Sequence, residues 1–308
     1  MSGPVTEQDA AAGAERGLPA SPEVELLTAR EATVGGLAVR RALPRRARRT
    51  VGAWCFADHF GQAAPPASMQ LGPHPHFGLH TVTWLVGGEV LHRDSLGSEQ
   101  LIRRGQLNLM TAGHGVAHAE EQPAHGGDVP LHGIQLWVAQ PEATRHGPAA
   151  FEHHADLPRV DVPGAEVTVL VGEMAGERSP ARTDTPLVGA EVALSSGAAT
   201  VPLHPAYEHA AVVLEGVVTL GGQRVATGVL AYLGEGRDDI VVGADAPARL
   251  MLLGGEPFPE PIVMSWNFVA RDRREVDRAA SDWNAGDQRF GSVDSALARI
   301  PAPGPGPG

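Results

Sequence analysis

The chain has 308 residues, of which 43% are hydrophobic and 19% charged, a composition typical of globular proteins and a length that accommodates about two domains. Its 24 basic and 36 acidic residues give a net charge of −12, which argues against a protein that binds nucleic acids in general. All of the basic residues are arginine, so Schiff-base chemistry and Walker-type phosphate binding, which both need lysine, are excluded.

The N-terminal segment has neither the composition of a folded element nor that of a targeting signal. Residues 1–22 are rich in Ala, Gly and Glu and lack both a basic start and an apolar core, so we expect a disordered tail and no signal peptide. No apolar run elsewhere approaches the ~18 residues that a membrane helix needs. The single cysteine, Cys55, excludes an intramolecular disulfide and a zinc site built from cysteines. We therefore expect a cytoplasmic protein without membrane contact.

Short apolar segments rich in Val and Leu dominate the rest of the chain. They span about four to six residues and recur about every 8 to 20 residues between turn residues, a pattern typical of antiparallel sandwiches and barrels. The segments are 81–86, 88–92, 107–110, 134–138, 167–171, 192–194, 212–214, 230–233, 240–242 and 250–253. The sequence therefore predicts an all-β fold.

A weak internal repeat divides this β-rich region in two. Residues 80–87 align with 209–216, and residues 105–113 align with 228–236. Pro and Gly cluster between the two copies, around 140–158, which predicts a boundary there.

The C-terminal region differs in its pattern. Helical spacing of apolar residues predicts a helix at 271–286 within a helical extension that reaches residue 300. The final segment, 301–308, reads PAPGPGPG and is predicted to be a second disordered tail.

Histidine is concentrated in the first half, where eleven of the 14 fall between His74 and His154. Two pairs with a single residue between their members, His74/His76 and His118/Glu120, lie beside glycine-rich turns. Residues two apart on a strand point to the same face, so each pair can direct two ligand atoms into one barrel. Three imidazoles and one carboxylate suit a divalent first-row metal such as Fe, Ni, Cu or Mn and leave positions for water or substrate. A single pair is more often a surface feature, but two pairs in one unit favour a metal site.

At this point the sequence resembles the pirin family of bicupins. The motifs that carry the resemblance are 56–61, 74–84, 92–97, 110–120 and 133–138 in the first unit and 204–210 and 214–216 in the second, and it covers about 25–270. It implies two packed cupin barrels, an N-terminal one at 23–145 and a C-terminal one at 155–270, followed by the extension at 271–300. It also implies one metal, with His74, His76, His118 and Glu120 as ligands. In the second unit these positions align with Leu203, Pro205, Val241 and Gly243, so we expect no metal there.

Two further histidines depart from the family pattern. Many pirins carry Glu at the position of His80 and Arg at the position of His114. Strand alternation places His80 on the side of His76, where it is either a fifth ligand or, as we favour, a residue that orients a ligand or packs beside it. His114 lies in a turn flanked by glycines and either lines the mouth of the pocket or is solvated.

The resemblance also implies a function. Similar bacterial pirins cleave flavonols such as quercetin with O2, and we expect the same activity here, with Glu120 as general base. The expected metal is Fe(II), and the alternatives are Ni, Cu, Mn or Zn. A small phenolic or flavonoid substrate is the expected partner. The alternative is a regulator that binds a partner protein without turnover, as some pirins do. A third reading is that the histidines bind nothing.

Overall fold

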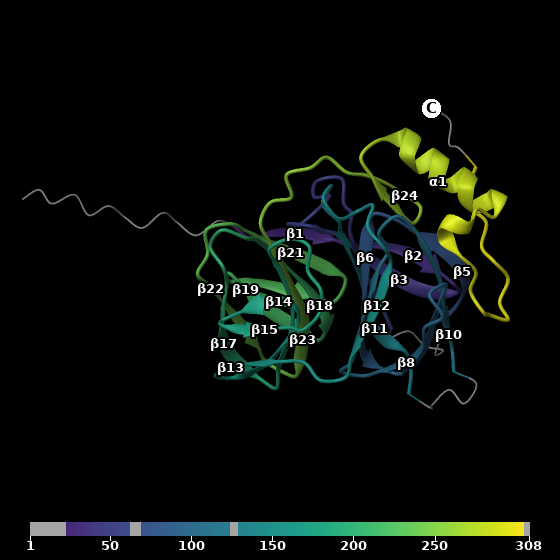
Figure 1. Ribbon diagram of the computed structural model, residues 1–308. Coiled ribbons are helices and arrows are strands. Elements are labelled where there is room, and N and C mark those ends of the chain that lie inside the picture. The colour runs from purple at the N-terminus through teal and green to yellow at the C-terminus, as the bar shows by residue number, and fades with distance from the viewer. Residues whose placement is uncertain (1–22, 62–68, 124–128, 305–308) are drawn as a thin grey trace, which may run out of the picture.

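The protein is built from two β-barrels that pack side by side, with a short helix at the C-terminus (Figure 1). The computed structural model describes residues 23–61, 69–123 and 129–304. The predicted all-β fold with two barrels and a C-terminal helix is confirmed. The predicted tail at 1–22 lies outside the described residues, and no helix within the described part of the chain is long and apolar enough to cross a membrane.

The first barrel consists of a sheet in the order β12-β9-β6-β11-β4-β3-β2 packed on a sheet in the order β5-β10-β7-β8. Its strands are β2 (Arg30–Val34), β3 (Leu37–Leu43), β4 (Trp54–Phe60), β5 (Gln70–His76), β6 (Leu79–Gly87), β7 (Glu89–Asp94), β8 (Glu99–Arg103), β9 (Leu107–Thr111), β10 (Val116–Glu121), β11 (His132–Ala139) and β12 (Ala150–His154). All of the pairings are antiparallel.

The second barrel repeats this arrangement, with a sheet in the order β1-β21-β18-β23-β16-β14-β13 and another in the order β17-β22-β19-β20; β15 pairs only with β14. Its strands are β1 (Glu25–Thr28), β13 (Arg159–Val162), β14 (Ala165–Met174), β15 (Glu177–Arg178), β16 (Leu187–Leu194), β17 (Gly197–Pro202), β18 (Glu208–Glu215), β19 (Val217–Leu220), β20 (Gln223–Ala226), β21 (Val229–Gly234), β22 (Asp239–Ala244) and β23 (Ala248–Gly255).

The edge strands β1 and β12 pair outside the bounds expected for the two domains. β1, near the start of the chain, pairs with β21 of the second barrel, and β12, which follows the expected end of the first domain, pairs with β9 of the first barrel. The strands therefore group differently from the predicted bounds of 23–145 and 155–270. Pairing partners far apart in sequence decide this grouping, and no local pattern encodes them.

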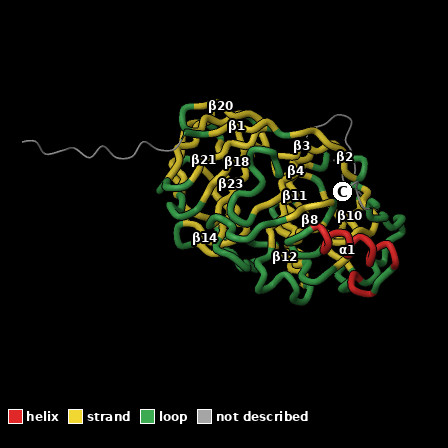
Figure 2. The backbone as a smooth tube through the Cα atoms, turned by 90° about the horizontal axis from the view of Figure 1, so that it is seen from above, coloured by secondary structure: helices red, strands yellow, loops and turns green. Residues whose placement is uncertain are grey.

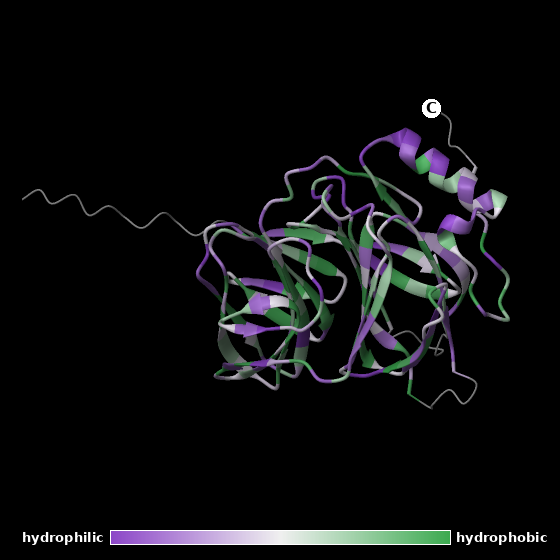
Figure 3. Cartoon of the chain, viewed as in Figure 1, coloured by the Kyte–Doolittle hydropathy of each residue, from purple (hydrophilic) through white to green (hydrophobic). Residues whose placement is uncertain are grey.

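A continuous apolar layer joins the barrels. Strands next to this layer are covered on both faces, which explains why their sequences are uninterrupted apolar runs. In β18, Ala211 and Val213 face the interior of the second barrel, whereas Val212 and Leu214 face the first barrel. Figure 3 shows hydrophobic residues along the strands of both barrels. Trp54 anchors the layer because its indole N–H donates to the carbonyls of Val188 and Gly254, each 3.1 Å away.

The C-terminal extension packs on the first barrel, on the side away from the second barrel (Figures 1 and 2). It begins with the hairpin β24 (Val263–Ser265) and β25 (Phe268–Ala270), which lies within the domain predicted to end at residue 270, and continues with α1 (Arg273–Ala285) and η1 (Gln288–Phe290). Asp272 caps the start of α1 by accepting from the backbone N–H of Glu275, and Gly286 ends it in the left-handed conformation.

The last described residues differ from the disordered tail expected at 301–308. Ala302 is buried, and its backbone exchanges two hydrogen bonds with the side chain of Asn284 on α1. Residues 301–304 are thus held against the helix, and residues 305–308 lie outside the described part of the chain.

The tight contact between the barrels predicts that one methyl group added at the interface lowers stability. A Cβ at Gly189 would lie 2.8 Å from the Trp54 ring, so Gly189→Ala should lower the free energy of unfolding by about 1–3 kcal/mol through overpacking. Gly243→Ala is the matched control, because a Cβ there has its nearest neighbour at 3.6 Å. Urea denaturation checks both, and equal stability of the two variants would contradict this account of the interface.

Candidate metal centre

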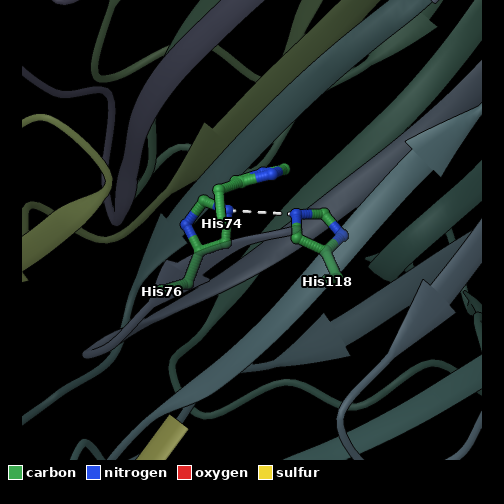
Figure 4. Close-up of side chains that lie close together, drawn as sticks. All are labelled: His74, His76 and His118. Atoms are coloured by element: carbon green, nitrogen blue, oxygen red, sulfur yellow. Dashed lines mark hydrogen bonds between the residues drawn. The ribbon is translucent and has the colours of Figure 1, made fainter. Parts of the chain in front are cut away.

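Two adjacent strands, β5 and β10, carry the predicted ligands into the first barrel. They pair antiparallel with His118 opposite His74. His74 and His76 share a face of β5, and all three imidazoles are buried. One nitrogen from each ring lies within 4.8 Å of those of the other two, and the Nε2 atoms of His76 and His118 are 3.1 Å apart (Figure 4). The structure therefore brings three of the four predicted ligands together.

Glu120, the fourth predicted ligand, lies outside this cluster but lines the same cavity. The register of β10 against β5 shifts between His118 and Glu120. The simple alternation of side chains between the two faces therefore does not hold where β10 pairs with β5. The Glu120 side chain is buried and has no hydrogen-bond partner among the described residues. A buried carboxylate with free oxygens beside three imidazoles fits a site that completes its coordination with a cation.

Backbone carbonyls orient two of the imidazoles. Nδ1 of His74 lies 2.9 Å from the carbonyl oxygen of Gly72, and Nδ1 of His76 lies 3.1 Å from that of Asn267 in the turn between β24 and β25. A carbonyl only accepts, so each Nδ1 carries the proton and each Nε2 keeps its lone pair as a potential ligand. The C-terminal hairpin thus holds a residue of the candidate centre in place.

A buried chain of side chains orients the third imidazole. Nδ1 of His118 lies 3.4 Å from Nδ1 of His92, and Nε2 of His92 lies 3.1 Å from Oδ2 of Asp94. Because the carboxylate accepts from His92, the other nitrogen of His92 is free to accept from His118. Asp94 is fixed in turn by the backbone N–H groups of Leu96 and Ser98, both 2.9 Å from its Oδ1. Phe151 of the edge strand β12 stacks on His92, with ring centroids 4.3 Å apart.

Burial sets the protonation state of the cluster. It lowers the pKa of His74 to about 4 and holds the pKa values of His76 and His118 well below their usual range, with neighbouring imidazoles adding to the effect. The three rings are therefore neutral at pH 7, the form that ligates metals. Burial raises the pKa of Glu120 to about 7. Three neutral nitrogens and one carboxylate fit a divalent cation both in charge and in donor type.

The cluster opens into a cavity of about 500 Å³, within the size range of small-molecule sites. The rings of Phe56 and Trp137 form one wall, stacked with centroids 4.0 Å apart. Arg41 lies over Phe56 at 4.6 Å and forms a two-fold ion pair with Asp58, at 2.8 and 2.6 Å. The C-terminal extension contributes residues as far along the chain as Ile300.

Residue spacing alone did not identify most of these lining and supporting groups. His92, Phe56 and Asp58 lie within motifs that resemble pirins, which was their only signal. Arg41 belongs to a run of arginines with no recognisable motif, and Asn267 acts through its backbone carbonyl, which leaves no trace in the sequence.

The structure corrects the interpretation of His80. Its Nε2 lies 3.1 Å from Oδ2 of Asp184, in the second barrel, and its Nδ1 lies 3.0 Å from Oγ1 of Thr111. β5 ends at His76 and the chain turns at Gly78, so His80 lies on β6 in the other sheet and strand alternation does not extend to it. His80 joins the barrels and supports neither the cluster nor its cavity.

His114 also lies away from the candidate centre. Its side chain is exposed in the turn before β10 and lies near His146, with ring centroids 6.1 Å apart. It does not line the cavity described above.

Comparison with known proteins agrees with this architecture. The family model described as Pirin matches residues 36–138, and that described as Pirin C-terminal cupin domain matches residues 189–291. A Pseudomonas aeruginosa protein named "Putative quercetin 2,3-dioxygenase PA1205" is 46% identical over 276 residues, covering 88% of this chain and 87% of that protein.

Solved structures show the same fold. The crystal structure of a quercetin 2,3-dioxygenase from Acinetobacter baumannii is 42% identical and superposes with a TM-score of 0.87, covering 91% of this chain and 95% of that chain. Escherichia coli YhhW in complex with nickel(II), described as a bacterial pirin, is 19% identical with a TM-score of 0.61, covering 76% of this chain and 100% of that chain. At that identity the likeness concerns the fold alone.

The chain from His118 to Asp94 predicts a measurable effect on metal binding. Asp94→Asn keeps a side-chain oxygen for the turn but removes the charge that accepts from His92, so metal affinity should fall by about 10–100-fold. Competition with a chelator of known affinity measures it. Asp161→Asn on the exposed face of β13 is the control. Unchanged affinity in Asp94→Asn would show that this chain does not act on the ligand.

The raised pKa of Glu120 predicts opposite effects of one substitution on metal binding and on stability. The folded state disfavours the ionised carboxylate, so metal-free protein should lose stability as pH rises from about 4.5 to about 7. Glu120→Gln removes the free-energy cost of burying the ionised carboxylate. It should stabilise the metal-free protein at pH 8 by about 1–3 kcal/mol, have little effect at pH 4, and weaken metal binding. Chemical denaturation at both pH values checks it, and destabilisation at pH 8 would contradict the assigned burial.

Proposed function

This chain belongs to the pirin family, and on that premise we propose that it is a metal-dependent dioxygenase that opens the central ring of a flavonol such as quercetin with O2. The observation that carries the proposal is the placement of three buried, neutral imidazoles and a buried carboxylate at the inner end of a cavity with an aromatic wall. The names of the similar proteins from P. aeruginosa and A. baumannii support the same activity.

The cavity suits a planar phenolic substrate. Phe56 and Trp137 offer a flat aromatic surface, and apolar side chains such as Leu37 and Met69 line the remaining walls. Rings of this kind bind flat aromatic ligands through stacking and exclusion of water. The ion pair between Arg41 and Asp58 is part of the lining, so the cavity can also position a hydroxyl group by hydrogen bonding.

His74, His76, His118 and Glu120 are the residues that would hold the metal, which we propose to be Fe(II). When bound, a divalent cation supplies a Lewis acid that lowers the pKa of a substrate hydroxyl. The carbonyls of Gly72 and Asn267 and the ring of His92 keep the three imidazoles in the tautomer that a cation requires. The buried walls exclude bulk water from the reacting ring.

Glu120 is the proposed general base. It lines the cavity, and when one of its carboxylate oxygens holds the metal the other remains available to accept a proton. It would accept the proton of the substrate 3-hydroxyl on a carboxylate oxygen, leaving the electron-rich anion that reacts with O2. A protein that serves only as a metal-dependent regulator would not need an aromatic cavity beside its metal ligands.

Turnover of quercetin by the metal-loaded protein tests this function. Glu120→Gln should lower turnover per bound metal by about 10²–10⁴-fold, because it removes the proton acceptor. Loss of quercetin absorbance and release of carbon monoxide in air are the readouts. Glu121→Gln is the matched control: the adjacent carboxylate bonds Arg93 and Ser295 and does not line the cavity. Absence of turnover with every first-row metal tested would reject the activity and favour the regulator.

A further inference from the structure

The second barrel has a cavity of about 660 Å³ at the position that corresponds to the metal cavity of the first. It opens where β17 ends, and β17 pairs with β22 as β5 pairs with β10. β14 and β16 form its walls, and they occupy the sheet positions that β3 and β4 occupy in the first barrel. The second barrel thus retains the cavity although no group of three potential metal ligands is found among its described residues.

Two side chains that line this cavity carry buried polar atoms without partners. Both ring nitrogens of His209 and the hydroxyl oxygen of Thr185 make no hydrogen bond of normal geometry, although the backbone of Tyr207 lies near enough to the imidazole to raise its pKa. His209 is completely buried, on the face of β18 that points into the second barrel. A Cβ at Gly254 would lie 2.5 Å from the ring, so this position needs glycine to leave room for the imidazole. Buried polar atoms are normally satisfied, so three unpartnered atoms beside one cavity indicate a missing partner.

The missing partner has to be a group that both donates and accepts. Burial lowers the pKa of His209 to about 4, so its imidazole is neutral at pH 7 and has one N–H and one acceptor nitrogen. The Thr185 hydroxyl also donates and accepts. A ligand hydroxyl satisfies such groups, whereas a carboxylate can only accept and an ammonium group can only donate.

The rest of the lining favours an uncharged aromatic ring. His204 and Tyr207 stack at 4.4 Å and offer a flat surface, and Met174 and Leu187 are apolar. Among the described lining residues the arginine, Arg178, is already paired with Glu173. An anion would therefore meet no free cation, and a planar neutral ligand would meet surfaces that suit it.

From these contacts we infer that the second barrel binds a small uncharged phenol without a metal, its hydroxyl bonded to His209 and Thr185 and its ring against Tyr207. This site is separate from the candidate metal centre, and its existence does not depend on the dioxygenase activity.

The test uses resorcinol as the probe and the full chain carrying His76→Ala, which removes the metal cluster and leaves the second barrel unchanged. Isothermal titration should show saturable binding that His209→Phe weakens by about tenfold or more and Thr185→Val by several-fold. 1,3-Dimethoxybenzene, which has the same ring without a hydroxyl donor, should also bind about tenfold more weakly.

His114→Phe is the matched control, because it makes the same change at an exposed histidine that lines neither cavity, and its affinity should equal that of the parent. Thermal melting followed by circular dichroism verifies folding, and Thr185→Val decides the result if His209→Phe does not fold. The inference is overturned if resorcinol does not saturate the parent chain, if the folded His209 or Thr185 variants bind with unchanged affinity, or if the dimethoxy compound binds equally well.

Discussion

The convergence of three buried imidazoles beside one cavity is the constraint on which the rest of the first barrel depends. The Nε2 atoms of His76 and His118 lie 3.1 Å apart. Because each carries a lone pair and no proton, neither can donate a hydrogen bond to the other. Glu120 adds a buried carboxylate that has no hydrogen-bond partner in the described part of the chain. A bound cation would offset the cost of burying these groups, which supports the proposal that they form a ligand set.

Distant parts of the chain hold this ligand set in place. Asn267 comes from the C-terminal hairpin, His92 and Asp94 come from β7, and Phe151, which stacks on His92, comes from the edge strand β12. The second barrel stabilises the first through the layer around Trp54 and through the bond between His80 and Asp184. Loosening of the contacts from Asn267 or His92 would alter the orientation of an imidazole, so the candidate centre depends on segments far apart in the chain.

The period-two spacing of strands made the histidine pairs and the β-rich fold predictable, because both depend on local geometry alone. The same rule failed for His80, where a turn separates it from His76, and it does not describe the shift in register beside Glu120. The pairing of β1 with the second barrel, the role of the Asn267 carbonyl and the surroundings of His209 depend on contacts between residues far apart in the sequence. A pattern in one sequence contains no information on such contacts, so they became visible only in the structure.

Elemental analysis of the untagged protein tests the central claim most directly. If the three imidazoles and Glu120 form one ligand set, the purified chain should contain about one equivalent of a first-row metal, and His76→Ala, folded as judged by circular dichroism, should contain almost none. A metal content that is the same in the wild-type protein and the variant, or wild-type protein that binds no metal when supplied with Fe(II) or Ni(II) under anaerobic conditions, would contradict the account.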